Sequence, residues 1–113
     1  QFGHLIMFGL GGIYVEVLLE VSFRLALLKM SDVEAMFREL KTFPLLKGIR
    51  GQEPSDLQNL KETILKVSQL VTDFPQIAEL DINPYKLFSK GGIAIDARIT
   101  VTWMKPQINT DKT

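Results

Sequence analysis

The hydrophobic pattern of this chain changes its period twice. Residues 5–28 are mostly aliphatic, aromatic and β-branched, and a glycine cluster interrupts them, which predicts three short strands. Apolar residues then recur at helical spacing over 32–42 and 55–73, and strict alternation returns over 78–102. Strands grouped on either side of two helices favour an α+β domain over a doubly wound array. We expect an antiparallel or mixed sheet with both helices on one face.

Both helices begin at a capping-box pattern, in which a serine is followed three residues later by glutamate or glutamine. The pairs are Ser31 with Glu34 and Ser55 with Gln58. The second helix is expected to end at Asp73-Phe74-Pro75, because proline cannot continue a helix. Its apolar stripe is formed by Leu57, Leu60, Ile64, Val67 and Val71.

The size of the chain fits one domain, expected over residues 1–104, followed by a polar tail at 105–113. Among its 113 residues, 13 basic and 13 acidic side chains cancel, so binding to nucleic acid is not expected. The absence of cysteine excludes disulfides and thiolate metal sites. Apolar runs are too short for a membrane span. The chain starts without methionine inside a strand-like run, and we expect it to be a piece of a longer protein.

Polar side chains gather on one face of a predicted C-terminal hairpin. Glu79, Asp81 and Asn83 alternate with apolar residues on its first strand, and Asp96 and Arg98 do so on its second. Carboxylate and amide oxygens on one sheet face suit magnesium, which takes one or two such ligands together with substrate phosphates and water. The alternative is that these side chains form only the solvated face of an amphipathic hairpin.

The turn decides which of these residues meet. The segment from Ser89 to Gly92 has the composition of a hairpin turn. A loop centred on Lys90-Gly91 would place Tyr85 opposite Asp96. Asp96 would then be the diagonal neighbour of Asn83 on the same face, about 7 to 8 Å away.

The hairpin sequence resembles the C-terminal signature of ATP-grasp enzymes in the NDP-forming acyl-CoA synthetase and succinyl-CoA synthetase group. The residues that carry the resemblance are Glu-Leu-Asp-Ile-Asn-Pro at 79–84, Gly91-Gly92 and Ile-Asp-Ala-Arg at 95–98. Three earlier blocks are similar to successive blocks of the same family: Phe8-Gly-Leu-Gly-Gly-Ile-Tyr-Val-Glu-Val-Leu18, Val21-Ser-Phe-Arg-Leu-Ala26 and Leu45-Leu-Lys-Gly-Ile-Arg-Gly51. The resemblance implies an ATP-grasp fold, in which two α+β subdomains clamp ATP, and makes this chain the C-terminal subdomain.

The resemblance also implies roles for residues of the hairpin. It places the magnesium ligands at Asn83 and Asp96, and a nucleotide-site carboxylate at Asp81. Arg98 matches a basic position beside the metal strand, where it could orient Asp96 or meet phosphate. An ordinary surface ion pair of Arg98 with Glu79 or Asp81 is the alternative.

Two further charges lie in blocks that line the nucleotide cleft of this family. Glu16 and Arg24 interrupt otherwise apolar strands, where a charge without a partner would be costly. We therefore expect both to belong to the nucleotide site. The alternative is that each lies at the edge of a strand and faces water. His4 is expected to have no role, because the phosphorylated histidine of the family belongs to other segments.

For the intact enzyme, the resemblance implies interconversion of acyl-CoA, nucleoside diphosphate and phosphate with free acid, CoA and nucleoside triphosphate, through a phosphohistidine. Its cofactors would be Mg²⁺ with ATP or ADP, and its partner a CoA-binding subunit or domain in a cytoplasmic oligomer. The chain alone is expected to be inactive and to hold no catalytic residue. The alternative is a regulatory pseudo-synthetase region fused to a protein acetyltransferase.

Overall fold

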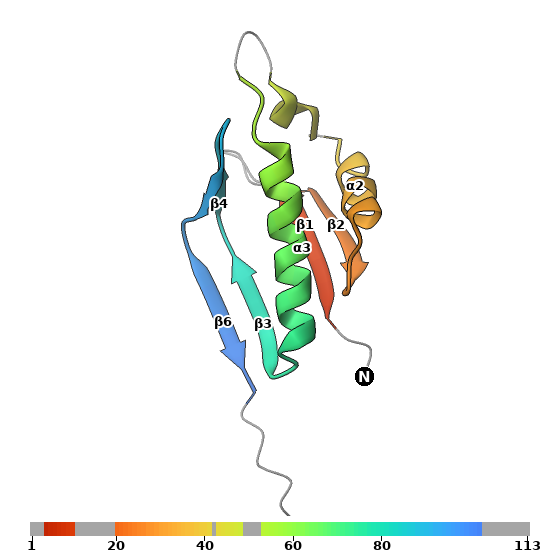
Figure 1. The fold of residues 1–113 in the computed structure, drawn as a ribbon, viewed down its shortest axis with the longest axis vertical. Helices are drawn as coiled ribbons and strands as arrows, with labels where there is room; N and C mark the ends of the chain where they lie inside the picture. Colours follow the sequence, from red (N-terminus) through yellow and green to blue (C-terminus); the bar gives the residue numbers. More distant parts are fainter. Residues whose placement is uncertain (1–3, 11–19, 42, 49–52, 103–113) are drawn as a thin grey trace, which may run out of the picture.

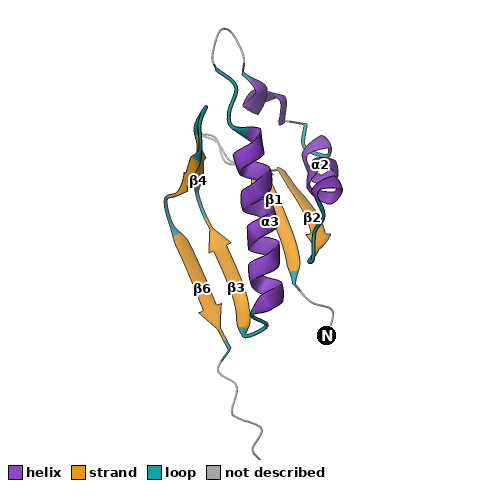
Figure 2. Cartoon of the chain, in the orientation of Figure 1, coloured by secondary structure: helices purple, strands orange, loops and turns teal. Residues whose placement is uncertain are grey.

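The structure, a computed structural model, describes residues 4–10, 20–41, 43–48 and 53–102. Its strands form three antiparallel pairs, β1 with β2, β3 with β6 and β4 with β5, and its helices pack against them (Figures 1 and 2). This confirms the predicted α+β class. The elements in chain order are β1 (Leu5–Leu10), β2 (Glu20–Leu25), α2 (Met30–Arg38), the 3₁₀ helix η1 (Phe43–Lys47), α3 (Leu57–Asp73), β3 (Ile77–Ile82), β4 (Tyr85–Leu87), β5 (Gly92–Ala94) and β6 (Ala97–Val101).

The first strands differ in part from the prediction. β1 continues through Gly9, where a break was expected, and pairs with β2 from Leu5 opposite Leu25 to Leu10 opposite Glu20. The predicted strand between them lies outside the described residues, as does the predicted tail. Of the helices that the structure describes, none combines the length and the apolar content needed to cross a bilayer.

The predicted start of α2 was wrong. The helix begins at Met30, and the Lys29 N–H donates to the carboxylate of Asp32 at 2.8 Å. With Lys29 as the N-cap, Asp32 therefore makes the contact that Glu34 was expected to make with Ser31. Glu34 instead forms an ion pair with Lys61 of α3 at 3.3 Å. The helix ends at Arg38, four residues earlier than expected.

The start of α3 was wrong by one residue, and its end was right. Asp56 is the N-cap, because its Oδ1 accepts the Asn59 N–H at 3.0 Å, whereas the sequence favoured Ser55. The last helical residue is Asp73, as predicted. The inward face of α3 includes buried Leu60, Ile64 and Val71.

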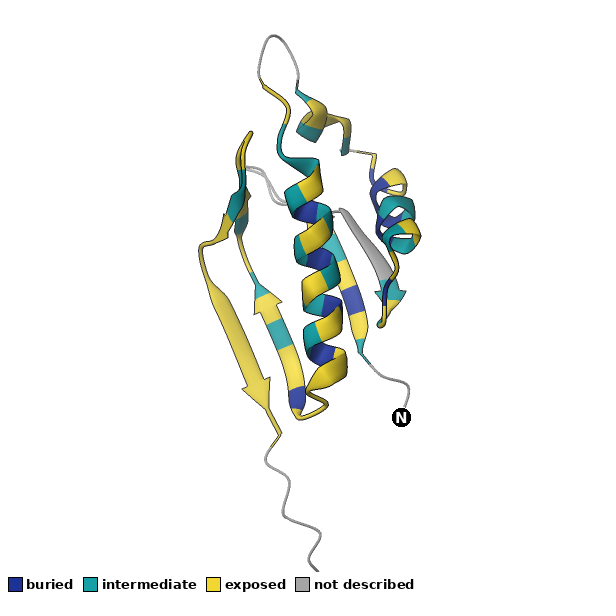
Figure 3. Cartoon of the chain, in the orientation of Figure 1, coloured by how far each residue is buried: buried dark blue, intermediate teal, exposed yellow. Residues whose placement is uncertain are grey.

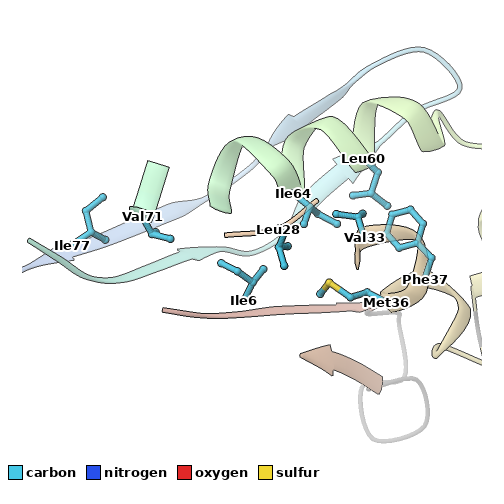
Figure 4. Close-up of a cluster of buried hydrophobic side chains, with 9 residues drawn as sticks. All are labelled: Ile6, Leu28, Val33, Met36, Phe37, Leu60, Ile64, Val71 and Ile77. Atoms are coloured by element: carbon cyan, nitrogen blue, oxygen red, sulfur yellow. The ribbon is translucent and has the colours of Figure 1, made fainter. Parts of the chain in front are cut away.

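The core lies between α3, α2 and the inner face of β1 (Figures 3 and 4). It also reaches β3, because Ile77 belongs to the same cluster. Phe8 of β1 contacts Phe37 of α2, with 5.2 Å between ring centroids, so both helices cover the same face of β1. The clustered buried residues are Ile6, Leu28, Val33, Met36, Phe37, Leu60, Ile64, Val71 and Ile77.

One polar side chain lies inside this core. Ser68 of α3 is 0% exposed, and its hydroxyl accepts the Leu28 N–H at 2.8 Å. A buried backbone donor without a partner would be costly, so this bond fixes the segment after β2 against the middle of α3.

We expect Ser68→Ala to lower the free energy of unfolding by about 1–3 kcal/mol, because it leaves the buried Leu28 N–H without an acceptor. Urea unfolding of the 113-residue chain measures this. Ser31→Ala is the matched control, since Ser31 is exposed and does not cap α2, and it should change stability little. Equal losses in the two variants would contradict the assignment.

Candidate functional site

The C-terminal hairpin, residues 77–102, brings the two predicted metal ligands together. Asp81 pairs with Arg98, and Ile82 pairs with Ala97. One step further, the Asn83 N–H donates to the Asp96 carbonyl at 2.9 Å. Residues directly opposite each other in an antiparallel pair present their side chains on the same face, so Asn83 and Asp96 are direct neighbours.

The predicted register was wrong by two residues. Tyr85 lies opposite Ala94 rather than Asp96, because the turn is centred on Ser89-Lys90. The Phe88 N–H donates to the Gly91 carbonyl at 2.9 Å, and Gly91 ends the turn with a φ of +76°, a conformation that favours glycine. In the observed register, Asp96 lies opposite Asn83, whereas the predicted register placed it diagonally.

The two candidate ligands lie where the hairpin changes direction. The base arm of the hairpin is β3 with β6, and its tip arm is β4 with β5 (Figure 1). Asn83-Pro84 joins the arms on one strand, and Ile95-Asp96 joins them on the other. The side chains of Asn83 and Asp96 are exposed at this junction. They can therefore reach a ligand from solvent.

The base arm has the predicted polar face on β3. Glu79, Asp81 and Asn83 are exposed, whereas Leu80 and Ile82 are half-buried, with Leu80 packed against the core. The alternation on β6 does not lead to burial, because β6 lies beyond β3 and is exposed along its length (Figure 3).

Arg98 contacts Asp96 rather than Glu79 or Asp81. Its Nε lies 3.9 Å from Asp96 Oδ2, and the two side chains are 80% and 58% exposed. Such a long, solvated ion pair contributes little stability, and an orienting role of Arg98 toward Asp96 stays a prediction.

The donor set fits a magnesium ion bound together with phosphate. Across the described part of the chain, no group of three or more His, Cys, Asp or Glu side chains is arranged to hold a metal. One carboxylate and one amide oxygen are too few for a metal cage made only of protein. They match the small protein contribution typical of magnesium–nucleotide sites.

Asp56 fixes the tip arm to the start of α3 through its backbone and its side chain. The Gly91 N–H donates to Asp56 Oδ2 at 2.7 Å, and the Asp56 N–H donates to the Phe88 carbonyl at 2.7 Å. The second carboxylate oxygen of Asp56 caps α3, so one side chain joins helix and hairpin. Hydrogen bonds from the Gly91 and Asn59 N–H groups hold the pKa of Asp56 below its ordinary value of 3.8.

Side chains make a second connection. The Tyr85 hydroxyl donates to Asn59 Oδ1 at 2.7 Å and lies 3.1 Å from the Thr63 hydroxyl. The Tyr85 ring also covers Gly92, where a Cβ would lie 2.5 Å from the ring. We call these contacts, together with those of Asp56, the hairpin clasp. No sequence pattern predicted the hairpin clasp, and the aspartate beside Ser55 is the local signal from which its capping half could be found.

The remaining predicted site residues lie elsewhere. Arg24 forms two hydrogen bonds with Glu39, at 3.1 and 2.5 Å, and these raise its pKa. This ion pair supplies the partner that an embedded charge needs, and nucleotide contact by Arg24 stays a prediction. Glu16 lies outside the described residues. His4 contacts the Ile77 carbonyl at 2.5 Å, which ties the start of β1 to β3.

Comparison with known proteins gives one family. The family model described as an ATP-grasp domain matches residues 1–101. The chain is 46% identical over 99 residues to the beta subunit of acetate–CoA ligase (ADP-forming) I from Pyrococcus furiosus, covering 88% of this chain and 43% of that protein. It is 50% identical over 90 residues to 4-hydroxybutyrate–CoA ligase (ADP-forming) from Nitrosopumilus maritimus, covering 80% of this chain and 13% of that protein.

A solved structure is similar over the same region. It is the dinucleotide-forming acetyl-coenzyme A synthetase 1 of Ca. Korarchaeum cryptofilum, in complex with coenzyme A and Mg-AMPPCP. The TM-score is 0.81 at 42% identity, covering 89% of this chain and 47% of the other. The chain therefore spans less than half the length of each of these relatives.

The lowered pKa of Asp56 makes stability depend on pH. Because folded Asp56 binds a proton less readily than unfolded Asp56, its contribution is present above the ordinary pKa of 3.8 and is lost as the pH falls through the lower folded value. We expect the wild type to lose more unfolding free energy than Asp56→Asn between about pH 5.5 and pH 3. Urea unfolding at both pH values measures the difference, and equal losses would contradict it.

Proposed function

This chain belongs to the ATP-grasp family, and we propose that it is the magnesium- and nucleotide-binding half of an ADP-forming acyl-CoA ligase. One observation carries the proposal: Asn83 and Asp96 lie opposite each other across the hairpin, and both are exposed. The relatives that support it are ADP-forming ligases.

The residues of the hairpin would divide the work. The Asn83 amide oxygen and the Asp96 carboxylate would hold the ion, and Arg98 would orient Asp96. Asp81, on the same exposed face, would keep the local potential negative and so favour a cation. A bound magnesium ion supplies positive charge to phosphate oxygens, where charge develops during phosphoryl transfer. The chain's own contribution is thus electrostatic and positional.

The other reactions of the ligase would need parts beyond this chain. Acyl-CoA chemistry and the phosphohistidine would belong to the rest of the parent enzyme, including a CoA-binding subunit or domain. Substrates such as ATP and CoA are consistent with a cytoplasmic enzyme. The alternative of an acetyltransferase-fused regulatory module receives no support from the relatives described above, which are ligases.

Exposed apolar side chains support the idea that other parts cover this one. On the outer face of β1 and β2, Leu5, Met7 and Leu25 are more than half exposed, and Ile99 and Val101 of β6 are likewise. Surfaces of this kind are typical of interfaces. The isolated chain would accordingly self-associate, and in the parent enzyme these surfaces would contact neighbouring domains or subunits.

We expect Asp96→Asn to weaken the binding of Mg²⁺ with ADP by about tenfold or more, because it removes the charged ligand. Titration followed by amide shifts of residues 81–98 measures this. Glu79→Gln is the control, since Glu79 shares the face but not the ligand pair. In the complete enzyme, Asp96→Ala should abolish phosphoryl transfer. Near-normal binding and turnover in these variants would refute the proposed site.

A further inference from the structure

The position of the candidate ligand pair depends on two arms that both contact the core cluster. The base arm does so through Leu80 and Ile77, and the tip arm through Tyr85 and Leu87. The tip arm is held in addition by polar contacts with the first turns of α3, through Asp56, Asn59 and Thr63. Asn83 and Asp96 lie at the junction between the arms, where their relative placement depends on the orientation of both.

The ladder is irregular at this junction. The Asn83 N–H bonds to the Asp96 carbonyl, but the next bond runs from the Ile95 N–H to the Pro84 carbonyl, each at 2.9 Å. No continuous ladder therefore transmits the geometry of the base arm to the tip arm. The polar contacts of the tip arm with α3, together with the packing of Tyr85 and Leu87 on the core, supply a constraint that the ladder does not.

We infer that Asp56 and Tyr85 are positioning residues for the Asn83–Asp96 pair. Asp56 fixes the turn through Gly91 and Phe88, and Tyr85 fixes the tip strand two residues after Asn83. Together they hold the tip arm at two points on α3, which restricts the orientation of one arm relative to the other. This inference deepens the proposed function, because the pair it positions is the proposed metal site.

Asp56→Asn removes the contact of Asp56 with Gly91 but keeps the N-cap of α3. Asparagine caps helices as well as aspartate does, so one amide oxygen can still accept the Asn59 N–H. The amide nitrogen would then face the Gly91 N–H, and two donors cannot bond each other. Tyr85→Phe removes the hydroxyl contacts with Asn59 and Thr63 and keeps the ring over Gly92. Glu62→Gln is the control, because Glu62 is an exposed carboxylate of the same helix.

The first measurement needs no metal. Amide hydrogen exchange of the 113-residue chain reports the junction through the Asn83 and Ile95 N–H groups, and the far end of the base arm through the Thr102 N–H, which bonds to the Gln76 carbonyl at 2.8 Å. We expect about tenfold faster exchange at the junction in Asp56→Asn, a smaller rise in Tyr85→Phe, and no change at Thr102. Unchanged junction exchange, or an equal rise at Thr102, would overturn the inference.

The second measurement uses Mn²⁺ together with ADP as the probe, and follows the broadening of the Asn83 and Asp96 amide signals by the bound metal. The apparent affinity should fall about tenfold in Asp56→Asn and stay at the wild-type value in Glu62→Gln. Wild-type affinity in Asp56→Asn would overturn the positioning role while leaving the metal site intact. Absence of broadening at the pair in the wild type would overturn the proposed function itself, whatever the exchange rates show.

Discussion

Burial of one face of α3 holds the two halves of this chain together. The described strands form three separate pairs, and no ladder joins β1 and β2 to the C-terminal hairpin. Leu60, Ile64 and Val71 of α3 instead contact β1, α2 and β3 in one apolar cluster (Figure 4). The sheet face that the helix does not cover is left for the polar residues of the hairpin. The helix therefore decides which face of the hairpin can bind a ligand.

Features with a local cause could be predicted from the sequence, and those decided by tertiary contacts could not. The stripe and the C-terminus of α3 follow from apolar spacing and from Pro75. The N-caps do not follow from the sequence, because a serine and an aspartate stand side by side at the start of both helices. The contact of Asp56 with Gly91, 35 residues away, favours the aspartate, and no local pattern contains that information.

The register error has a similar origin. A shift by two residues leaves every side chain on its original face, so the alternation of apolar and polar residues fits both registers. Only the turn distinguishes them, and in the structure Gly91 ends the turn with a φ of +76°. The sequence thus predicted the exposed face and the proximity of Asn83 and Asp96, but not their direct opposition. The partner of Arg24 is Glu39, 15 residues away. The sequence indicated that Arg24 needs a partner, but not which residue it is.

The proposed site consists of one divalent cation shared by Asn83 and Asp96. A crystal structure of the chain with Mn²⁺ and a non-hydrolysable ATP analogue tests it most directly, because manganese is located by its anomalous signal. We predict a single peak about 2.1 Å from both the Asn83 amide oxygen and an Asp96 carboxylate oxygen, with phosphate oxygens completing the shell. A peak held by Glu79 and Asp81 instead, or nucleotide bound with no metal near Asp96, would contradict the account.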